Sequence, residues 1–511
     1  MSERLSTPDQ VQAGRIRIAE LLATYPEWFM TLSSRDSQPL SRTELDVRVA
    51  HGRLVLTCWT EKGTRSWRIF AWEWTYEKLI LWASRKLGAE RPVIELVPRA
   101  SARAIALTVK VARQLRCDQL GRLVCSVQVG AKLERCSLSP GARRGQPGRY
   151  ARILLRQKHQ RIAITGSVVS SKPSDADAFL SAALIWFKRT SERVRSPYIQ
   201  HLWLIVETDL VKPTIQRIVL LRPSLRDVIA VYEADQQLTE LKHVYVPPRE
   251  ELWNRRLGRF PRTVAKPASE ITKKLVDLAP DAIDVVNVRY GETLRYFGLP
   301  FARVRELMGT ERVWFGIEGL RRCLLERKTE NEWINLLTDL KLYRSAGASD
   351  HRHALYRGAA EAWLEALMRR DITKLDPGLI IAPLHAQFRT SRTGVVGGRP
   401  IDLLALRRDG RLVVIELKVS EAREHVLQGA DYWQRVEAHR RRGHISRAKL
   451  FGNRKIKDDP PLVYLVAPTL RVHPSFNALA RSIAADIEIY RFDINEDWRA
   501  GVRVMRRTRV N

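Results

Sequence analysis

Two apolar runs near the C-terminus, IDLLAL (401–406) and LVVIELKV (412–419), decide how this chain is interpreted. Both are rich in aliphatic residues, and the intervening Arg408-Asp409-Gly410 is typical of a β-hairpin loop. Asp402 lies in the first run, and Glu416 and Lys418 lie in the second. The chain therefore places three charged side chains in strands that are otherwise built for a core.

The length of the hairpin loop decides whether these charges can meet. A two-residue turn would offset the strands by one position, so that Asp402 and Glu416 would point to opposite faces. A three-residue loop, with Gly410 in the left-handed conformation of a G1 bulge, puts Asp402 directly opposite Glu416. Glycine tolerates positive φ, so we expect this second register, with Lys418 on the same face.

Both faces of the expected hairpin are apolar, as in strands that are covered on both sides. Burying unpaired charge is costly, so the three groups should pair with one another or bind a metal. Carboxylate oxygens, completed by water and phosphate oxygens, suit Mg²⁺ or Mn²⁺. The alternative is a buried salt bridge of Lys418 with one of the acids, without catalysis.

The order of these residues resembles the PD-(D/E)xK nuclease superfamily, and within it the RecB-like and NucS-like branches. That family has a helix with a Glu, a strand, an Asp on a second strand, (D/E)-x-K on a third, and a helix with Gln-x-x-x-Tyr. In this chain the corresponding elements are a helix with Glu361, a strand at 384–388, Asp402, Glu416 with Lys418, and a helix with Gln428 and Tyr432.

The resemblance implies a catalytic role for each of these residues. Asp402 and Glu416 would hold the metal, and the Leu417 carbonyl would add a ligand. Lys418 would orient or activate the attacking water and stabilise the negative charge that develops on the phosphate.

The flanking helices supply the supporting residues that the resemblance implies. Glu361 would support the metal shell through water, and Glu365 is the alternative for that role. Gln428 and Tyr432 lie one helical turn apart on one face and would brace the site or touch the DNA backbone.

The resemblance covers residues 346–511 and implies a restriction-endonuclease-like mixed sheet flanked by helices. Ile401 separates Pro400 from the Asp here, at a position that varies in these branches. Some RecB-like nucleases bind an iron–sulfur cluster through four cysteines. The last cysteine of this chain is Cys323, so no Fe-S cluster is expected.

The chain is strongly basic, with a formal net charge of +32. Residues 51–200 hold 28 Lys and Arg against 10 Asp and Glu. Such a region favours phosphate backbones, because each contact releases condensed counterions. We expect this nucleic acid to be DNA. The candidate contacts are Arg143 and Arg144 in a Gly/Pro/Arg-rich loop, followed by Arg149, Arg152 and Arg156.

We expect a multidomain α/β (α+β) protein. Residues 1–247 form a basic α/β region with room for two subdomains, which we could not assign to a family. Residues 248–345 are expected to be a mostly helical connector with a short hairpin near 285–297, and residues 346–511 the nuclease-like domain. The five irregularly spaced cysteines indicate neither a disulfide framework nor a zinc site.

No apolar signal core or membrane-spanning run is present, so we expect a cytoplasmic location. No P-loop is found, so any ATP-driven motor would come from a separate partner protein. A homodimer is the other partner that we consider. The expected function is a Mg²⁺- or Mn²⁺-dependent deoxyribonuclease, an endonuclease or exonuclease for DNA repair, restriction or mobile-element defence. The alternatives are a non-catalytic nucleic-acid-binding or assembly protein that retains the fold, and an RNA-directed nuclease.

Overall fold

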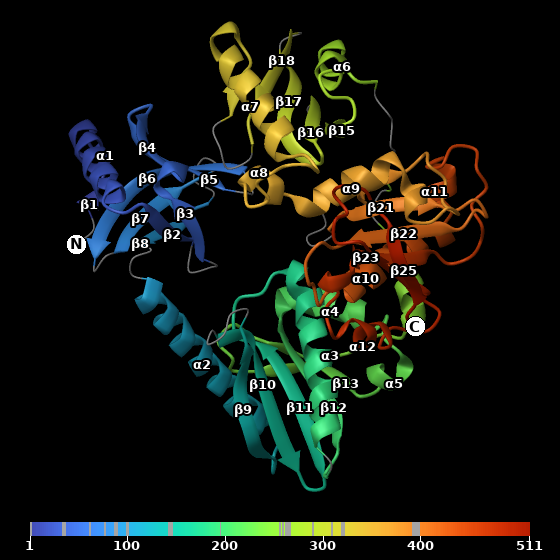
Figure 1. Ribbon diagram of the computed structural model, residues 1–511. Coiled ribbons are helices and arrows are strands. Elements are labelled where there is room, and N and C mark those ends of the chain that lie inside the picture. The colour runs from blue at the N-terminus through green and yellow to red at the C-terminus, as the bar shows by residue number, and fades with distance from the viewer. Residues whose placement is uncertain are drawn as a thin grey trace. The chain divides into compact units, whose positions relative to one another are not determined.

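The fold is taken from a computed structural model, in which the described residues form mixed α/β structure with several sheets, in agreement with the expected α+β multidomain class (Figure 1). The chain divides into two compact units, residues 1–113 with 316–323, and residues 114–315 with 324–511. The described residues are 3–32, 37–60, 63–75, 78–85, 90–98, 102–141, 147–194, 196–254, 257, 260, 267–288, 291–307, 310–317, 322–390 and 399–511.

The first unit is built on an antiparallel sheet with the strand order β3-β2-β8-β7-β6-β5-β4, and β1 pairs with β6. Helix α1 (Pro8–Ala23) begins at a capping box formed by Thr7 and Gln10. It packs against β4 and β5. The tryptophans Trp28, Trp67 and Trp72 are buried in its core. The strands are β1 (Glu3–Arg4), β2 (Glu27–Leu32), β3 (Ser37–Ser41), β4 (Leu45–Ala50), β5 (Arg53–Thr60), β6 (Gly63–Thr75), β7 (Lys78–Ser84) and β8 (Val93–Pro98).

The second unit begins with a six-stranded mixed sheet, which we call the N-terminal module. Its order is β14-β13-β12-β11-β10-β9. One face packs on α2 and the other on α3 and α4. Its elements are α2 (Ala102–Val127), β9 (Lys132–Pro140), β10 (Pro147–Gln157), β11 (Gln160–Ser167), α3 (Ala176–Arg193), β12 (Ile199–Glu207), α4 (Thr208–Ile218), α5 (Pro223–Arg226), β13 (Ile229–Ala234) and β14 (Leu241–Val244).

The segment expected to be a mostly helical connector is instead dominated by a five-stranded sheet, so that prediction is wrong. Apolar Ala302 and Val304 alternate with Arg303 and Arg305 along its longest strand, the period expected of a strand with one buried face. Its elements are α6 (Glu270–Val276), β15 (Ile283–Val288), β16 (Gly291–Tyr296), β17 (Leu299–Leu307), β18 (Thr310–Phe315), β19 (Cys323–Leu324) and α7 (Glu330–Tyr343).

The C-terminal module is a second six-stranded mixed sheet, ordered β20-β21-β22-β23-β24-β25. Helix α9 covers one face, and α10 covers the other. This mixed sheet flanked by helices agrees with the expectation at that coarse level. Its elements are α8 (Ala354–Arg357), α9 (Ala360–Arg370), β20 (His385–Phe388), β21 (Ile401–Leu406), β22 (Leu412–Leu417), α10 (His425–Arg441), α11 (His444–Arg447), β23 (Leu462–Pro468), α12 (Phe476–Ala480), β24 (Ile489–Ile494) and β25 (Val504–Arg509).

The two modules of the second unit share one apolar core, in which α3 and α4 meet α10 and α12. Arg217 of α4 lies at the centre of this contact and is almost fully buried. It pairs with Asp177 of α3 at 2.9 Å and with Asp431 of α10 at 3.1 Å. Short 3₁₀ helices connect the larger elements at Arg42–Glu44, Pro173–Asp175, Arg249–Asn254, Arg327–Thr329, Ile372–Lys374 and Thr469–Arg471.

Within the described part of the chain, we find no helix with the length and apolar character needed to cross a membrane.

Candidate functional site

The hairpin of β21 and β22 has the register expected from its loop. The Arg407 N–H donates to the Arg411 carbonyl at 2.9 Å, and Gly410 has a φ of +84°. A β-carbon at Gly410 would also lie 2.7 Å from a backbone oxygen of the 453–457 loop. Leu403 pairs with Ile415, so the next pair along the strands is Asp402 with Glu416. The register prediction is confirmed, and both carboxylates project from the same face.

Glu416 is the most buried acid of this cluster, with 1% of its surface exposed. Its Oε1 accepts from Lys418 Nζ at 2.7 Å and from the amide nitrogen of Gln428 at 3.0 Å. Its Oε2 is buried without a hydrogen bond from an N–H or hydroxyl group of the described residues, and the Asp402 carboxyl lies within hydrogen-bonding reach of the Glu416 carboxyl. Burial, and then the adjacent Asp402 carboxylate, raise the pKa of Glu416 well above its ordinary range, against the opposing Lys418 ammonium. A buried carboxylate with one oxygen free is open to a cation.

Asp402 is held by the backbone of the neighbouring strand and by an amide. Its Oδ2 accepts from the Leu417 N–H at 2.9 Å, and its Oδ1 accepts from Gln387 Nε2 at 3.4 Å. The same Gln387 nitrogen donates to Glu365 Oε2 at 2.6 Å. Gln387 has a φ of +48°, a conformation that costs a non-glycine residue about 1–2 kcal/mol. Sequence analysis missed Gln387, because its role depends on how β20 pairs with β21.

Lys418 links Glu416 of β22 to Glu361 of α9. Besides Glu416, its Nζ lies 3.7 Å from Glu361 Oε2 and donates weakly to the Leu417 carbonyl at 3.3 Å. Burial alone would lower the pKa of Lys418, but the carboxylates of Glu416 and Glu361 outweigh it and raise that pKa above its ordinary value. Lys418 is therefore a cation at neutral pH.

The two α9 candidates occupy different positions. The Glu361 side chain is 46% exposed and reaches Lys418, whereas Glu365 is buried and reaches Gln387 and, at 3.6 Å, Arg295 of β16. Removal from water raises the pKa of both carboxyls, and the nearby Asp402 carboxylate adds to this rise. Glu361 thus faces the open side of the cluster, and Glu365 lies behind it.

Helix α10 contributes one of its two predicted residues directly. The Gln428 amide bridges Glu416 and the Arg399 guanidinium, which precedes β21. Tyr432 is buried in an apolar cluster beneath the Arg435 guanidinium, 4.6 Å from its ring centroid, and burial raises its pKa. Tyr432 therefore supports the helix that carries Gln428.

Two further residues of the site were missed by sequence analysis. His425 is buried at the start of α10, and its Nε2 lies 3.3 Å from the Glu416 carbonyl oxygen. Burial, and then the Lys418 ammonium, lower the pKa of His425 to about 3, so its ring is neutral at physiological pH. Arg399 orients Gln428. The position of His425 one turn before Gln428 on the same helix was a signal that could have indicated it.

The predicted nucleic-acid contacts are only partly described. Arg143 and Arg144 lie outside the described residues. Arg149 is exposed and lies 3.3 Å from Asp175, Arg152 is half-buried, and Arg156 is exposed. All three are on β10 of the N-terminal module, so they do not belong to the carboxylate cluster itself.

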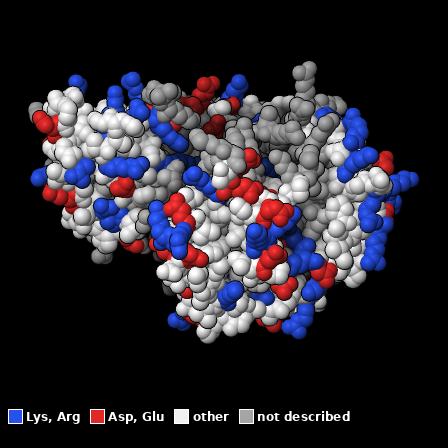
Figure 2. Space-filling model, turned by 90° about the horizontal axis from the view of Figure 1, so that it is seen from above, with Lys and Arg blue, Asp and Glu red and all other residues white. Residues whose placement is uncertain are grey.

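A basic surface also lies in the C-terminal module. Residues 440–457 contain eight Lys and Arg and no Asp or Glu. Most of these side chains are exposed at the end of α10, in α11 and in the following loop. In Figure 2 the right-hand side, where α11 lies in Figure 1, carries a band of Lys and Arg side chains.

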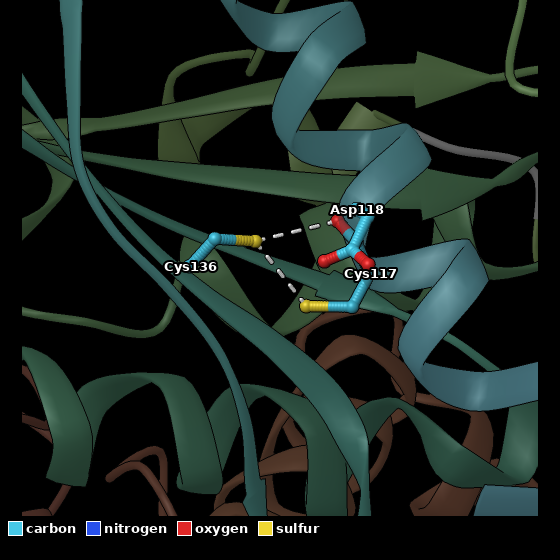
Figure 3. A group of neighbouring side chains, drawn as sticks. All are labelled: Cys117, Asp118 and Cys136. Atoms are coloured by element: carbon cyan, nitrogen blue, oxygen red, sulfur yellow. Dashed lines mark hydrogen bonds between the residues drawn. The ribbon is translucent and has the colours of Figure 1, made fainter. Parts of the chain in front are cut away.

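A different donor set lies in the N-terminal module, where the sequence indicated no metal site. Cys117 and Asp118 of α2 approach Cys136 of β9, with ligand atoms within 4.8 Å of one another (Figure 3). The two sulfurs are 3.5 Å apart. Thiols with one carboxylate favour soft metals, whereas the oxygen donors of Asp402 and Glu416 favour Mg²⁺ or Mn²⁺.

Comparisons with protein-family models, with curated proteins and with solved structures gave no match to this chain.

Proposed function

We propose that the chain is a metal-dependent nuclease that hydrolyses phosphodiester bonds of DNA, with its active site at the ends of β21 and β22 in a restriction-endonuclease-like module. The observation that carries this proposal is the buried Glu416 carboxylate with its free oxygen, beside Asp402 and the Lys418 ammonium. Burying two acids is costly without a cation to neutralise them. Lys418 offsets part of this charge, and a divalent ion would offset the rest.

The donor chemistry fits Mg²⁺ or Mn²⁺. Glu416 Oε2, Asp402 Oδ1 and the Leu417 carbonyl are hard oxygen donors of the kind these ions take, and they leave positions for water and phosphate oxygens. When bound, such an ion polarises a phosphoryl oxygen and lowers the pKa of a bound water.

The chain's own residues orient the two carboxylates and neutralise negative charge. The Leu417 N–H and Gln387 fix the Asp402 carboxylate, and Gln428 fixes Glu416. Lys418 stays protonated, so it would bind an anionic phosphate and stabilise the additional negative charge of the transition state. Its compact ammonium can approach a phosphate and a water where a planar guanidinium would not fit equivalently.

The test is cleavage of labelled single-stranded, duplex and flapped DNA, and of RNA, with Mg²⁺ or Mn²⁺. We expect Asp402→Asn and Glu416→Gln to abolish metal-dependent cleavage of DNA while DNA binding persists. Glu421→Gln is the matched control, because it removes an exposed carboxylate shortly after Lys418. Undiminished cleavage by the Asp402→Asn, Glu416→Gln double variant would refute the proposal, and cleavage of RNA alone would replace the substrate.

A further inference from the structure

The two modules of the second unit have the same strand order and directions. In the N-terminal module β9, β10 and β11 are antiparallel, β12 and β13 continue parallel to β11, and β14 is antiparallel. The C-terminal module repeats this pattern from β20 to β25. Helices occupy matching connections: α2 and α9 precede the sheets, α3 and α10 follow the third strand, and α4 and α12 follow the fourth.

The strand ends establish which residues correspond. Glu416 pairs with Leu465, which lies three residues before the end of β23 at position 468. Thr165 pairs with Leu204, which lies three residues before the end of β12 at position 207. The next strand agrees, because Leu465 pairs with the third residue of β24 and Leu204 with the third residue of β13.

At the matched strand positions the N-terminal module has no acid and no lysine, and the charged residue among them is Arg152, in the place of Asp402. Arg152 pairs with Thr165, as Asp402 lies opposite Glu416. The Thr165 hydroxyl is buried and has no described hydrogen-bond partner. The matched residues are Gln387 with Ser137, Asp402 with Arg152, Glu416 with Thr165, and Lys418 with Ser167.

The contact between the leading helix and the first strand has also changed its chemistry. In the C-terminal module it joins Glu365 to Gln387 by a hydrogen bond. In the N-terminal module the α2–β9 contact joins the thiols of Cys117 and Cys136, which point toward each other in Figure 3. Cys136 is the neighbour of Ser137, the residue matched to Gln387, and Asp118 lies beside the two thiols. The N-terminal module therefore lacks the two strand acids and the amide that positions Asp402.

Arg152 lies in a cluster of guanidinium groups. Its guanidinium is 5.9 Å from the Trp186 ring centroid, and burial together with the charges of Arg423 and Arg189 lowers its pKa to about 10. Arg152, Arg189 and Arg423 form no ion pair with a carboxylate among the described residues. Repelling cations without acidic partners are open to an anion.

The same cluster lies beside the proposed active site. Arg423 belongs to the loop between β22 and α10, five residues after Lys418. The modules meet here, since the Arg399 guanidinium donates to the Ser174 carbonyl at 3.5 Å. A polyanion bound at Lys418 would extend onto the face of Arg152.

We propose that the N-terminal module is an internal copy of the C-terminal module without its two strand acids, and that it binds the phosphate backbone of the duplex with Arg152, Arg189 and Arg423, so that each chain has one cutting centre and one gripping centre. The inference rests on the proposed nuclease function for the cutting centre alone. The gripping centre is tested without cleavage.

The experiment measures duplex DNA affinity of the full chain in EDTA, across a range of salt concentrations. We expect Arg152→Gln to lower affinity severalfold and to reduce the slope of log K against log salt by about 0.9, the value for one lost phosphate contact. Arg189→Gln removes an exposed member of the cluster. It should lower the affinity and the salt slope in the same way, even if Arg152→Gln folds poorly. Lys158→Gln, at the far turn of the same hairpin, is the control and should bind like the wild type.

Wild-type affinity and salt slope in both Arg152→Gln and Arg189→Gln would overturn the inference. Intact DNA binding that depends on these arginines, without cleavage of any substrate, would refute the proposed nuclease instead. The two failures are therefore distinguishable.

Discussion

The N-terminal and C-terminal modules share a six-stranded topology and differ in the few side chains that occupy one row of the sheet. In the C-terminal module that row carries two carboxylates, followed by an ammonium, and in the N-terminal module it carries an arginine and two hydroxyls. The backbone provides the same position for chemistry in both. What acts there is decided by the residues, as expected when function lies in a site on the fold.

The largest expected contrast lies between Lys418 and its counterpart Ser167. Lys418→Met removes the cation that faces the phosphate, so we expect cleavage to fall by about three orders of magnitude, ~4 kcal/mol of activation free energy. Ser167→Ala should stay within about twofold of the wild type, since the proposed chemistry does not use that hydroxyl. Single-turnover rates with Mg²⁺ would measure both. Equal losses in the two variants would remove the distinction between the modules.

Mutation of the contact between the modules should strongly lower the free energy of unfolding. Arg217 neutralises Asp177 and Asp431 inside the shared core, so Arg217→Ala leaves two buried acids unpaired. We expect it to lower the free energy of unfolding by about 3–5 kcal/mol. Urea unfolding measures this loss. Lys188→Ala, which breaks the exposed Lys188–Glu192 pair, is the control and should change stability by about 1 kcal/mol or less.

Loss of the contact at the first strand should lower metal affinity or activity by one to two orders of magnitude in the C-terminal module and leave activity unchanged in the N-terminal module. Gln387→Ala frees the Asp402 carboxylate, and loss of such an outer partner typically costs about 10–100-fold in metal affinity or activity. The thiol contact in the other module has no such task, so Cys117→Ser should leave the rate unchanged. Titration of activity against Mn²⁺ would reveal the shift in metal affinity. An unchanged titration for Gln387→Ala would exclude Gln387 as a positioning residue.

The smallest expected effect concerns stability against pH without metal. The pKa of Glu416 is raised in the folded state above its ordinary value of about 4.3. The folded state therefore holds a proton that the unfolded state releases, and this contribution to stability is lost as pH rises above about 4.3. Glu416→Gln should thus raise the Tm of the metal-free protein at pH 7 and have little effect at pH 4. Mg²⁺ should raise the Tm of the wild type only.

The hairpin of β21 and β22 could be predicted because the residues that determine its register are close together in the sequence. Gly410 and the alternation of its flanking strands decide the register, and the structure has that register. Glu361 and Gln428 were found through motif order, and both contact the cluster. Gln387 could not be found in this way, because its position opposite Asp402 is set by the pairing of a short, irregular strand.

The relation between the modules was hidden because it lies in topology rather than in residues. Arg152 and Thr165 share no chemistry with Asp402 and Glu416, so no sequence motif links the two rows. The connector was mispredicted for a different reason. Its turn at Phe297-Gly298, where both φ values are positive, is tight and was not recognised as a hairpin signal.

We propose above all that a chain with two modules has a single cutting centre. Supercoiled plasmid, incubated with the full chain and Mg²⁺ at limiting protein concentration, measures this directly. We expect open circles that carry one nick as the first product, and no product with Glu416→Gln. Linear plasmid as the first product at every protein concentration, or conversion that Glu416→Gln leaves unchanged, would contradict the account.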